Sequence, residues 1–173
     1  MMAGVTLTAC SSGPAKAQRS KPTSTVATTA ASRPQQLVLS GYAAASAALA
    51  AAEVHNDANW PALFQTMVNP ELAHVQAFIT TGEHLGYHAR GTYRIIRAEV
   101  TSFSPTRAAV TACVDDNVIA YQANGQPAPG NAGRATYAIE MAVMVPTGAT
   151  WVLQDGTAQQ FPTLQKAGPL CAG

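Results

Sequence analysis

Residues 107–116 read Arg-Ala-Ala-Val-Thr-Ala-Cys-Val-Asp-Asp, and this stretch decides the fold. Successive side chains of a strand point to opposite faces of a sheet. One face of the stretch carries Ala108, Val110, Ala112 and Val114, and the other carries Ala109, Thr111 and Cys113. The pattern predicts a strand that places Cys113 just before two acids, and the rest of the chain is interpreted around it.

Strand-like segments lie on both sides of this stretch. Alternation or β-branched residues predict strands over residues 93–102, 118–121, 137–145 and 151–155, the last continuing through 157–161. Residues 137–145 alternate most regularly. Ser-Pro-Thr at 104–106 and Pro-Thr-Gly at 146–148 mark short turns, which favour antiparallel neighbours.

Helical patterns come before the strands. Residues 39–56 are rich in alanine, the best helix former, and Tyr42, Ala45, Leu49 and Ala52 share one face. A short helix is predicted from Pro61, and a third begins at Asn69-Pro70-Glu71 with an apolar stripe through Phe78 and Ile79. Three helices followed by strands predict an α+β fold, with the helices packed on one face of a curved antiparallel sheet of four to six strands.

The first 36 residues differ in composition from the rest. They hold four basic residues and no acid, whereas residues 37–173 hold six basic residues and nine acids, so the tail carries +4 and the remainder −3. Residues 11–36 are rich in Ser, Thr, Pro and Ala and contain no aromatic residue, which predicts a disordered linker before a single domain at 37–173. A mildly acidic domain argues against nucleic acid as a partner.

Residues 7–10, Leu-Thr-Ala-Cys, resemble the lipobox of bacterial lipoproteins, in which the cysteine receives a lipid after signal cleavage. A complete signal also needs a cationic start and an apolar run of about 7 to 15 residues. Residues 1–9 contain neither, so we interpret 1–10 as a truncated signal and expect the true start upstream. The alternative is an incidental cysteine at position 10.

The chain as a whole resembles small actinobacterial lipoproteins with a nuclear transport factor two-like domain, a cone-shaped fold that ketosteroid isomerases share. The resemblance rests on the lipobox, on Cys113-Val114-Asp115-Asp116, on Gly125-Gln126-Pro127, on the segment from Trp151 to Asp155, and on Cys171. It implies the cone fold over residues 37–173, export and a disulfide. Proteins of this group are mostly of unknown function.

Three cysteines fit one disulfide and one remainder. If Cys10 carries a lipid, Cys113 and Cys171 are the pair that the resemblance implies, and an exported domain can keep such a bond. Two free cysteines remain the alternative.

The polar residues that could line the cone are Tyr93, Asp115, Tyr137 and Glu140. In relatives a pocket carboxylate acts as a base beside a tyrosine or a protonated acid, but these four residues match no catalytic motif. Asp115 and Asp116 are adjacent, so in a strand they point to opposite faces and do not share a site. His74, His84 and His88 are interpreted as solvated rather than as metal ligands, and we expect no metal or cofactor.

These observations predict a noncatalytic protein anchored by lipid to the outer face of the cytoplasmic membrane, or secreted. We expect it to bind a small apolar ligand or an envelope protein. The alternatives are a small cyclase- or isomerase-like enzyme, and an accessory subunit that docks through an exposed apolar patch. A carboxylate with a raised pKa, within hydrogen-bond reach of a tyrosine, would favour the enzyme, and an apolar or filled pocket would favour binding.

Overall fold

A computed structural model describes residues 31–130 and 136–172. Three helices come first: α1 (Arg33–His55), α2 (Pro61–Thr66) and α3 (Glu71–His84). Six strands follow: β1 (His88–Arg90), β2 (Tyr93–Ser104), β3 (Arg107–Asp116), β4 (Ile119–Tyr121), β5 (Tyr137–Thr147) and β6 (Thr150–Phe161). Two single-turn helices, α4 (Leu164–Ala167) and α5 (Pro169–Ala172), end the described chain. The predicted α+β class is confirmed.

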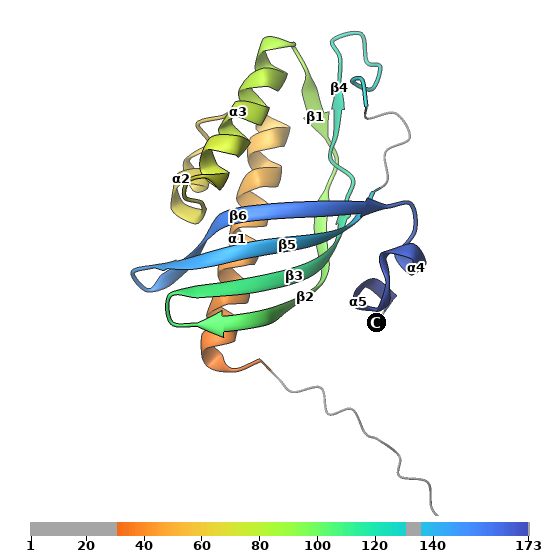
Figure 1. Cartoon of the computed structure of the whole chain (residues 1–173). Helices are drawn as coiled ribbons and strands as arrows, with labels where there is room; N and C mark the ends of the chain where they lie inside the picture. Colours follow the sequence, from red (N-terminus) through yellow and green to blue (C-terminus); the bar gives the residue numbers. More distant parts are fainter. Residues whose placement is uncertain (1–30, 131–135, 173) are drawn as a thin grey trace, which may run out of the picture. The chain divides into compact units, whose positions relative to one another are not determined.

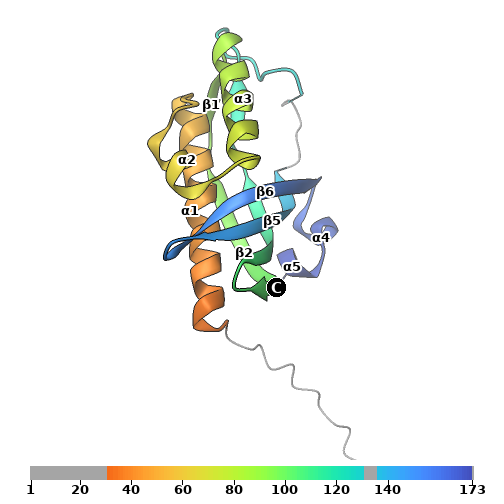
Figure 2. The ribbon, with the colours of Figure 1, turned by 60° about the vertical axis from the view of Figure 1, so that its left-hand side comes forward.

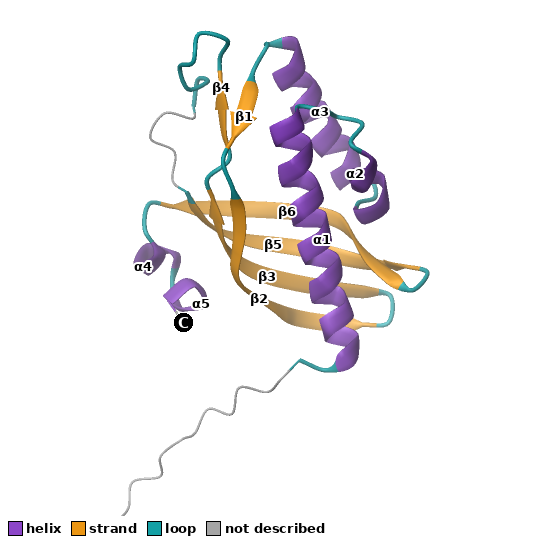
Figure 3. Cartoon of the chain, turned by 180° about the vertical axis from the view of Figure 1, so that it is seen from behind, coloured by secondary structure: helices purple, strands orange, loops and turns teal. Residues whose placement is uncertain are grey.

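The main sheet is antiparallel, with strand order β2-β3-β5-β6, and β1 and β4 form a separate two-stranded ribbon. Register shifts occur in β2 and between Val143 and Met144 of β5. Such bulges bend strands and increase their twist. The sheet curves across α1 (Figure 1), and the view from behind shows α1 lying over its inner face (Figure 3).

The main core lies between α1 and this inner face. Tyr42, Ala45 and Ala52 of α1 are at most 2% exposed, and Val110 and Val114 of β3 are at most 1% exposed. The face of α1 that carries Tyr42, Ala45 and Ala52 is buried, as the helical spacing predicted, and the Val110 face of β3 is the inner one. Alanines on both surfaces let the helix backbone lie close to the strands.

The first helix begins earlier than predicted. It starts at Arg33 rather than near residue 39, so the last four residues of the predicted 11–36 linker are helical. The Ser32 N–H donates to Gln35 Oε1 at 3.0 Å, and Pro34 lies in the first turn. Such contacts favour a helix start before the alanine run. Residues 11–30 of the linker and Cys10 lie outside the described residues.

Within the described chain, α1 is long and apolar enough to span a membrane by length and composition. Its buried face, however, packs against the sheet as a core helix.

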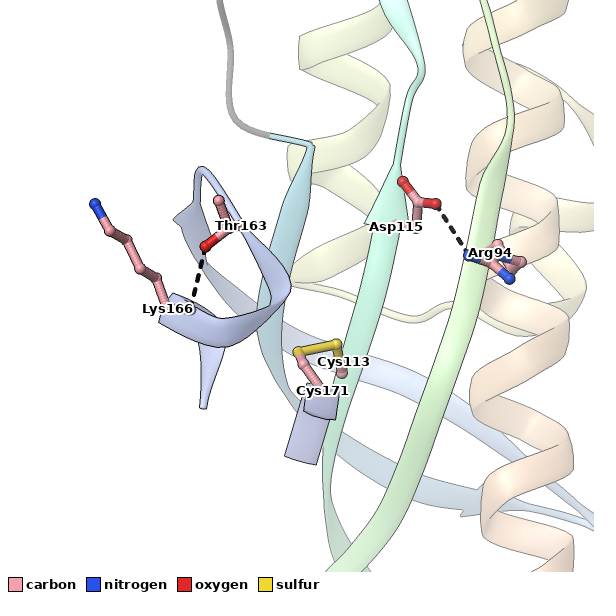
Figure 4. The surroundings of a disulfide bond; sticks show 6 residues. All are labelled: Arg94, Cys113, Asp115, Thr163, Lys166 and Cys171. Atoms are coloured by element: carbon pink, nitrogen blue, oxygen red, sulfur yellow. Dashed lines mark hydrogen bonds and ion pairs between the residues drawn. A yellow bond between two sulfur atoms is a disulfide. The ribbon is translucent and has the colours of Figure 1, made fainter. Parts of the chain in front are cut away.

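A smaller cluster lies on the outer face of the sheet, where α4 and α5 pack (Figure 2). Cys113 of β3 and Cys171 of α5 form a disulfide there, with Cα atoms 5.3 Å apart (Figure 4). Cys113 is fully buried on the face opposite Val114. The bond ties the end of the described chain to the middle of the sheet.

Strand β5 was predicted from its odd-numbered residues, yet its even-numbered side faces α1. Ala138, Ala142 and Met144 are at most 4% exposed in the main core, whereas Met141 is 58% exposed. The strand was recognised because large apolar residues occupy every odd-numbered position from 137 to 145. The consequence is that Glu140, between two core alanines, faces the helices.

Candidate functional site

A cavity of about 180 Å³, here called the Glu140 cavity, lies between the helices and strands β5 and β6. Its lining residues are Tyr42, Ser46, Leu49, Met67, Glu71, Tyr93, Glu140, Met141, Ala142, Leu153, Gly156, Thr157 and Ala158. Most of this lining is apolar or uncharged. The two carboxylates are the charged groups among the lining residues.

Glu140 accepts hydrogen bonds from two tyrosines on different elements. Tyr42 of α1 donates to Glu140 Oε2 at 2.5 Å, and Tyr93 of β2 donates to the same oxygen at 2.7 Å. The two hydroxyl oxygens lie 3.3 Å apart. Two donors compensate a carboxylate for the water it loses on burial, so the three residues form a satisfied polar network at the edge of the core.

Both tyrosines remain protonated donors at neutral pH. Burial raises the pKa of Tyr42 well above its ordinary value, and the charge of Glu140 raises it further. The same two causes, in the same order, raise the pKa of Tyr93. A phenolate beside the Glu140 carboxylate would place two negative charges in a poorly hydrated site.

The second acid, Glu71, is the first residue of α3. Burial raises its pKa, and the negative charges of Asp155 and Glu140 act in the same direction. His74 and a hydrogen bond from the Gly156 backbone oppose this shift. The cavity therefore brings two carboxylates close enough to influence each other.

Two of the four predicted pocket residues lie in this cavity, and two do not. Tyr93 and Glu140 line it, whereas Asp115 and Tyr137 are paired across β3 and β5 on the outer face, the face of Cys113. Asp115 instead receives a hydrogen bond from Arg94 at 3.2 Å (Figure 4). The assignment of Asp115 and Tyr137 to the pocket is wrong, because strand alternation places them opposite Glu140.

Sequence reasoning did not assign Tyr42 and Glu71 to the site. Tyr42 was interpreted only as a core residue of the alanine helix, and Glu71 only as an acid at a helix start. A signal for Tyr42 did exist, since a buried tyrosine hydroxyl usually needs a hydrogen-bond partner. For Glu71 the chain offered no such signal, because its approach to β6 depends on tertiary packing.

The hydrogen-bond pattern limits the chemistry of the cavity. Stabilising a developing oxyanion requires donors aimed at the place where the charge appears. Here both tyrosine protons are directed at Glu140. Of the described residues that line the cavity, none is a lysine, arginine or histidine that could act as a cationic electrophile or as a partner base.

A second groove, of about 210 Å³, lies between α3 and the β1–β4 ribbon. Phe78 and Leu85 line it and are 64% and 58% exposed. This is the exposed apolar surface that the accessory-subunit alternative requires, although it lies beside the ribbon rather than on the main sheet.

No protein-family model matches the chain, and no curated protein matches its sequence. Solved structures are similar in fold. A protein of Novosphingobium aromaticivorans that is assigned as an aromatic ring hydroxylase has a TM-score of 0.53 at 14% identity, over 80% of this chain and 100% of that chain. A Caulobacter vibrioides protein with a cystatin-like fold has a TM-score of 0.46 at 12% identity, over 72% and 89% of the two chains. The intermembrane-space region of the chloroplast protein ARC6 has a TM-score of 0.44 at 12% identity, over 73% and 97%.

These identities concern the fold alone. The similarity to the Novosphingobium protein agrees with the predicted fold, in which helices pack on a curved antiparallel sheet.

Proposed function

We propose that the protein is an exported, lipid-anchored, noncatalytic binding domain whose Glu140 cavity takes a small ligand. The observation that carries this proposal is that Tyr42 and Tyr93 both donate to the same oxygen of Glu140. Because both hydroxyl protons are donated to Glu140, they do not form an oxyanion site. A ligand would instead be recognised by its shape, its apolar contacts and its charge.

The size of the cavity restricts the ligand. Cavities that hold drug-sized molecules usually measure about 300 to 1,000 Å³, and the Glu140 cavity measures about 180 Å³. An engineered apolar cavity of about 150 Å³ holds benzene. The expected ligand therefore has about one ring, or a short chain of similar volume.

Export and anchoring rest on the sequence together with the disulfide. A Cys113–Cys171 bond is typical of proteins outside the reducing cytosol. The Leu-Thr-Ala-Cys motif at 7–10 supplies a lipid site at Cys10, and its resemblance to actinobacterial lipoproteins extends over the domain.

Intact mass tests the anchor. The protein is isolated from its native membrane fraction and alkylated with and without reduction. We expect a chain that begins at lipidated Cys10 and shows two thiols only after reduction. An unlipidated chain with free thiols would reject both the anchor and the export.

Ligand-observed NMR on the full chain tests the cavity, with single-ring compounds that are cationic, neutral or anionic. Ala158 lies opposite Glu140 on β6 and lines the cavity, so Ala158→Leu should block binding. Gln159→Leu, the next residue along the strand, is the matched control, because its side chain points to the outer face. Equal binding by both variants would place the ligand elsewhere.

The enzyme alternative keeps one observation in its favour. Glu71 is a cavity carboxylate with a raised pKa, as a general base or acid in a cyclase or isomerase would need. If the protein converts a bound compound, and Glu71→Gln abolishes the conversion but not the binding, the protein is an enzyme rather than a binding protein. Release of the compound unchanged supports the binding role.

A further inference from the structure

The charge of the Glu140 cavity is unbalanced. Glu71 and Glu140 both line it, and Asp155 precedes Gly156 in its wall. Within residues 31–130 and 136–172, the ion pair that the structure contains is Arg94–Asp115, on the other side of the sheet from Glu140. Among these described residues, no cationic side chain lies within ion-pair distance of Glu71 or Glu140.

His74 does not remove this imbalance. It is close enough to Glu71 to oppose the rise in the pKa of that carboxyl, but burial and the two neighbouring acids outweigh it. His74 does not line the cavity.

The rest of the wall suits an apolar body. Leu49, Met67, Met141 and Leu153 line the same space. Methionine side chains adapt to irregular shapes and to aromatic rings. The cavity thus combines apolar walls, two carboxylates and room for about one ring.

Building on the binding role proposed above, we propose that the ligand of the Glu140 cavity is a small organic cation: an ammonium group on an apolar body of about one ring. The ammonium lies by Glu71 and Glu140, and the body contacts Leu49, Met67 and Leu153. An anion of the same size would meet two like charges, and a neutral compound would leave both carboxylates without a cation.

Three probes of nearly equal shape test the ligand class: benzylamine, benzyl alcohol and benzoate. Their affinities for the full chain are measured by calorimetry at about pH 7. We expect benzylamine to bind at least about tenfold more tightly than benzyl alcohol, and benzoate to show no binding. Benzyl alcohol binding as well as benzylamine would overturn the cation while leaving the binding role intact. Failure of all three probes would overturn both.

Two variants locate the ammonium. Glu71→Gln removes one carboxylate without touching the tyrosine hydrogen bonds, so the preference for benzylamine should fall severalfold while the fold is retained. Asp115→Asn, on the outer face, is the matched control and should leave the preference unchanged. Glu140→Gln should lower the same preference for benzylamine, and its circular dichroism spectrum should match that of the wild type, which shows that the variant is folded. If Asp115→Asn loses the preference for benzylamine, the ammonium does not lie by Glu71 and Glu140. The same conclusion follows if both glutamine variants keep the preference.

Discussion

Tyr42 on α1 donates a 2.5 Å hydrogen bond to Glu140 on β5, a residue 98 positions later in the chain. This bond links the helix to the sheet in the wall of the Glu140 cavity. Tyr93 meets the same carboxylate oxygen from β2, so three elements converge on one acid. The network both stabilises the domain and sets the charge of the candidate site.

The contribution of this network to stability can be measured directly. Hydrogen bonds to charged groups typically contribute about 1.5 to 3 kcal/mol. Tyr42→Phe should lower the free energy of unfolding in urea by about that amount. Tyr121→Phe, in the half-buried β4 strand, is the control and should change it by less than about 0.5 kcal/mol. Equal effects would mean that the hydroxyl of Tyr42 has no special role.

Glu71 predicts a pH dependence with a definite sign. Its pKa in the folded state is raised above the ordinary value of 4.5, so the folded chain takes up a proton more readily than the unfolded chain does. The stability gained from the protonated form is fully present below about pH 4.5 and is lost as pH rises through the raised pKa. Glu71→Gln should therefore stabilise the protein at pH 7 relative to wild type, with the gain disappearing near pH 4.

Urea unfolding of both chains at the two pH values checks this. Glu99→Gln, an exposed acid on β2, is the control, and it should show no such change. A Glu71→Gln variant that is destabilised at pH 7 would show that the carboxylate is favourably placed, against the unbalanced charge described above.

The disulfide should hold α5 against the sheet. It closes a separation of 58 residues, and removal of a native disulfide from a small exported domain typically costs about 2 to 5 kcal/mol. The double variant Cys113→Ala, Cys171→Ala should show this loss in unfolding experiments. Reducing agent should destabilise the wild type by a similar amount and leave the double variant unaffected. Sensitivity of the double variant to reductant would show that the bond is not the cause.

Close packing of α1 on β6 predicts opposite results for two helical glycines. A Cβ at Gly41 would clash with the carbonyl oxygen of Trp151, whereas a Cβ at Gly82 has its nearest neighbour, Asn56 Oδ1, at 3.5 Å. Alanine gains about 1 kcal/mol of helix propensity over glycine at either site. Gly82→Ala should raise the melting temperature and Gly41→Ala should lower it. Similar shifts in both variants would contradict the packing.

The sequence predicted the parts of the fold that depend on local pattern. The shared face of α1 that carries Tyr42 follows from a period of 3.6 residues, and the two faces of β3 follow from a period of 2 residues. β5 also alternates with a period of 2 residues, but its more apolar side faces away from α1. Glu140 lies among core alanines on the side that faces α1, where two tyrosine hydroxyls donate hydrogen bonds to it. A buried acid of this kind depends on contacts between elements distant in the chain, which no local pattern contains.

The same limit applies to the site. Glu140 and Tyr93 were assigned to a pocket, but Asp115 and Tyr137 were placed with them because the face of each strand was not yet known. Glu71 reaches the cavity only because α3 packs beside β6. Strand β1 and helices α4 and α5, of three or four residues each, were not predicted.

A crystal structure of the full chain soaked with benzylamine would show directly whether the Glu140 cavity binds a small cation. We expect the amine in the Glu140 cavity, with its nitrogen within hydrogen-bond distance of Glu71 or Glu140 and with Tyr42 and Tyr93 still donating to Glu140. An empty cavity beside an amine bound elsewhere, or tyrosine hydroxyls turned from Glu140 toward the ligand, would contradict it. The second of these results would favour the enzyme.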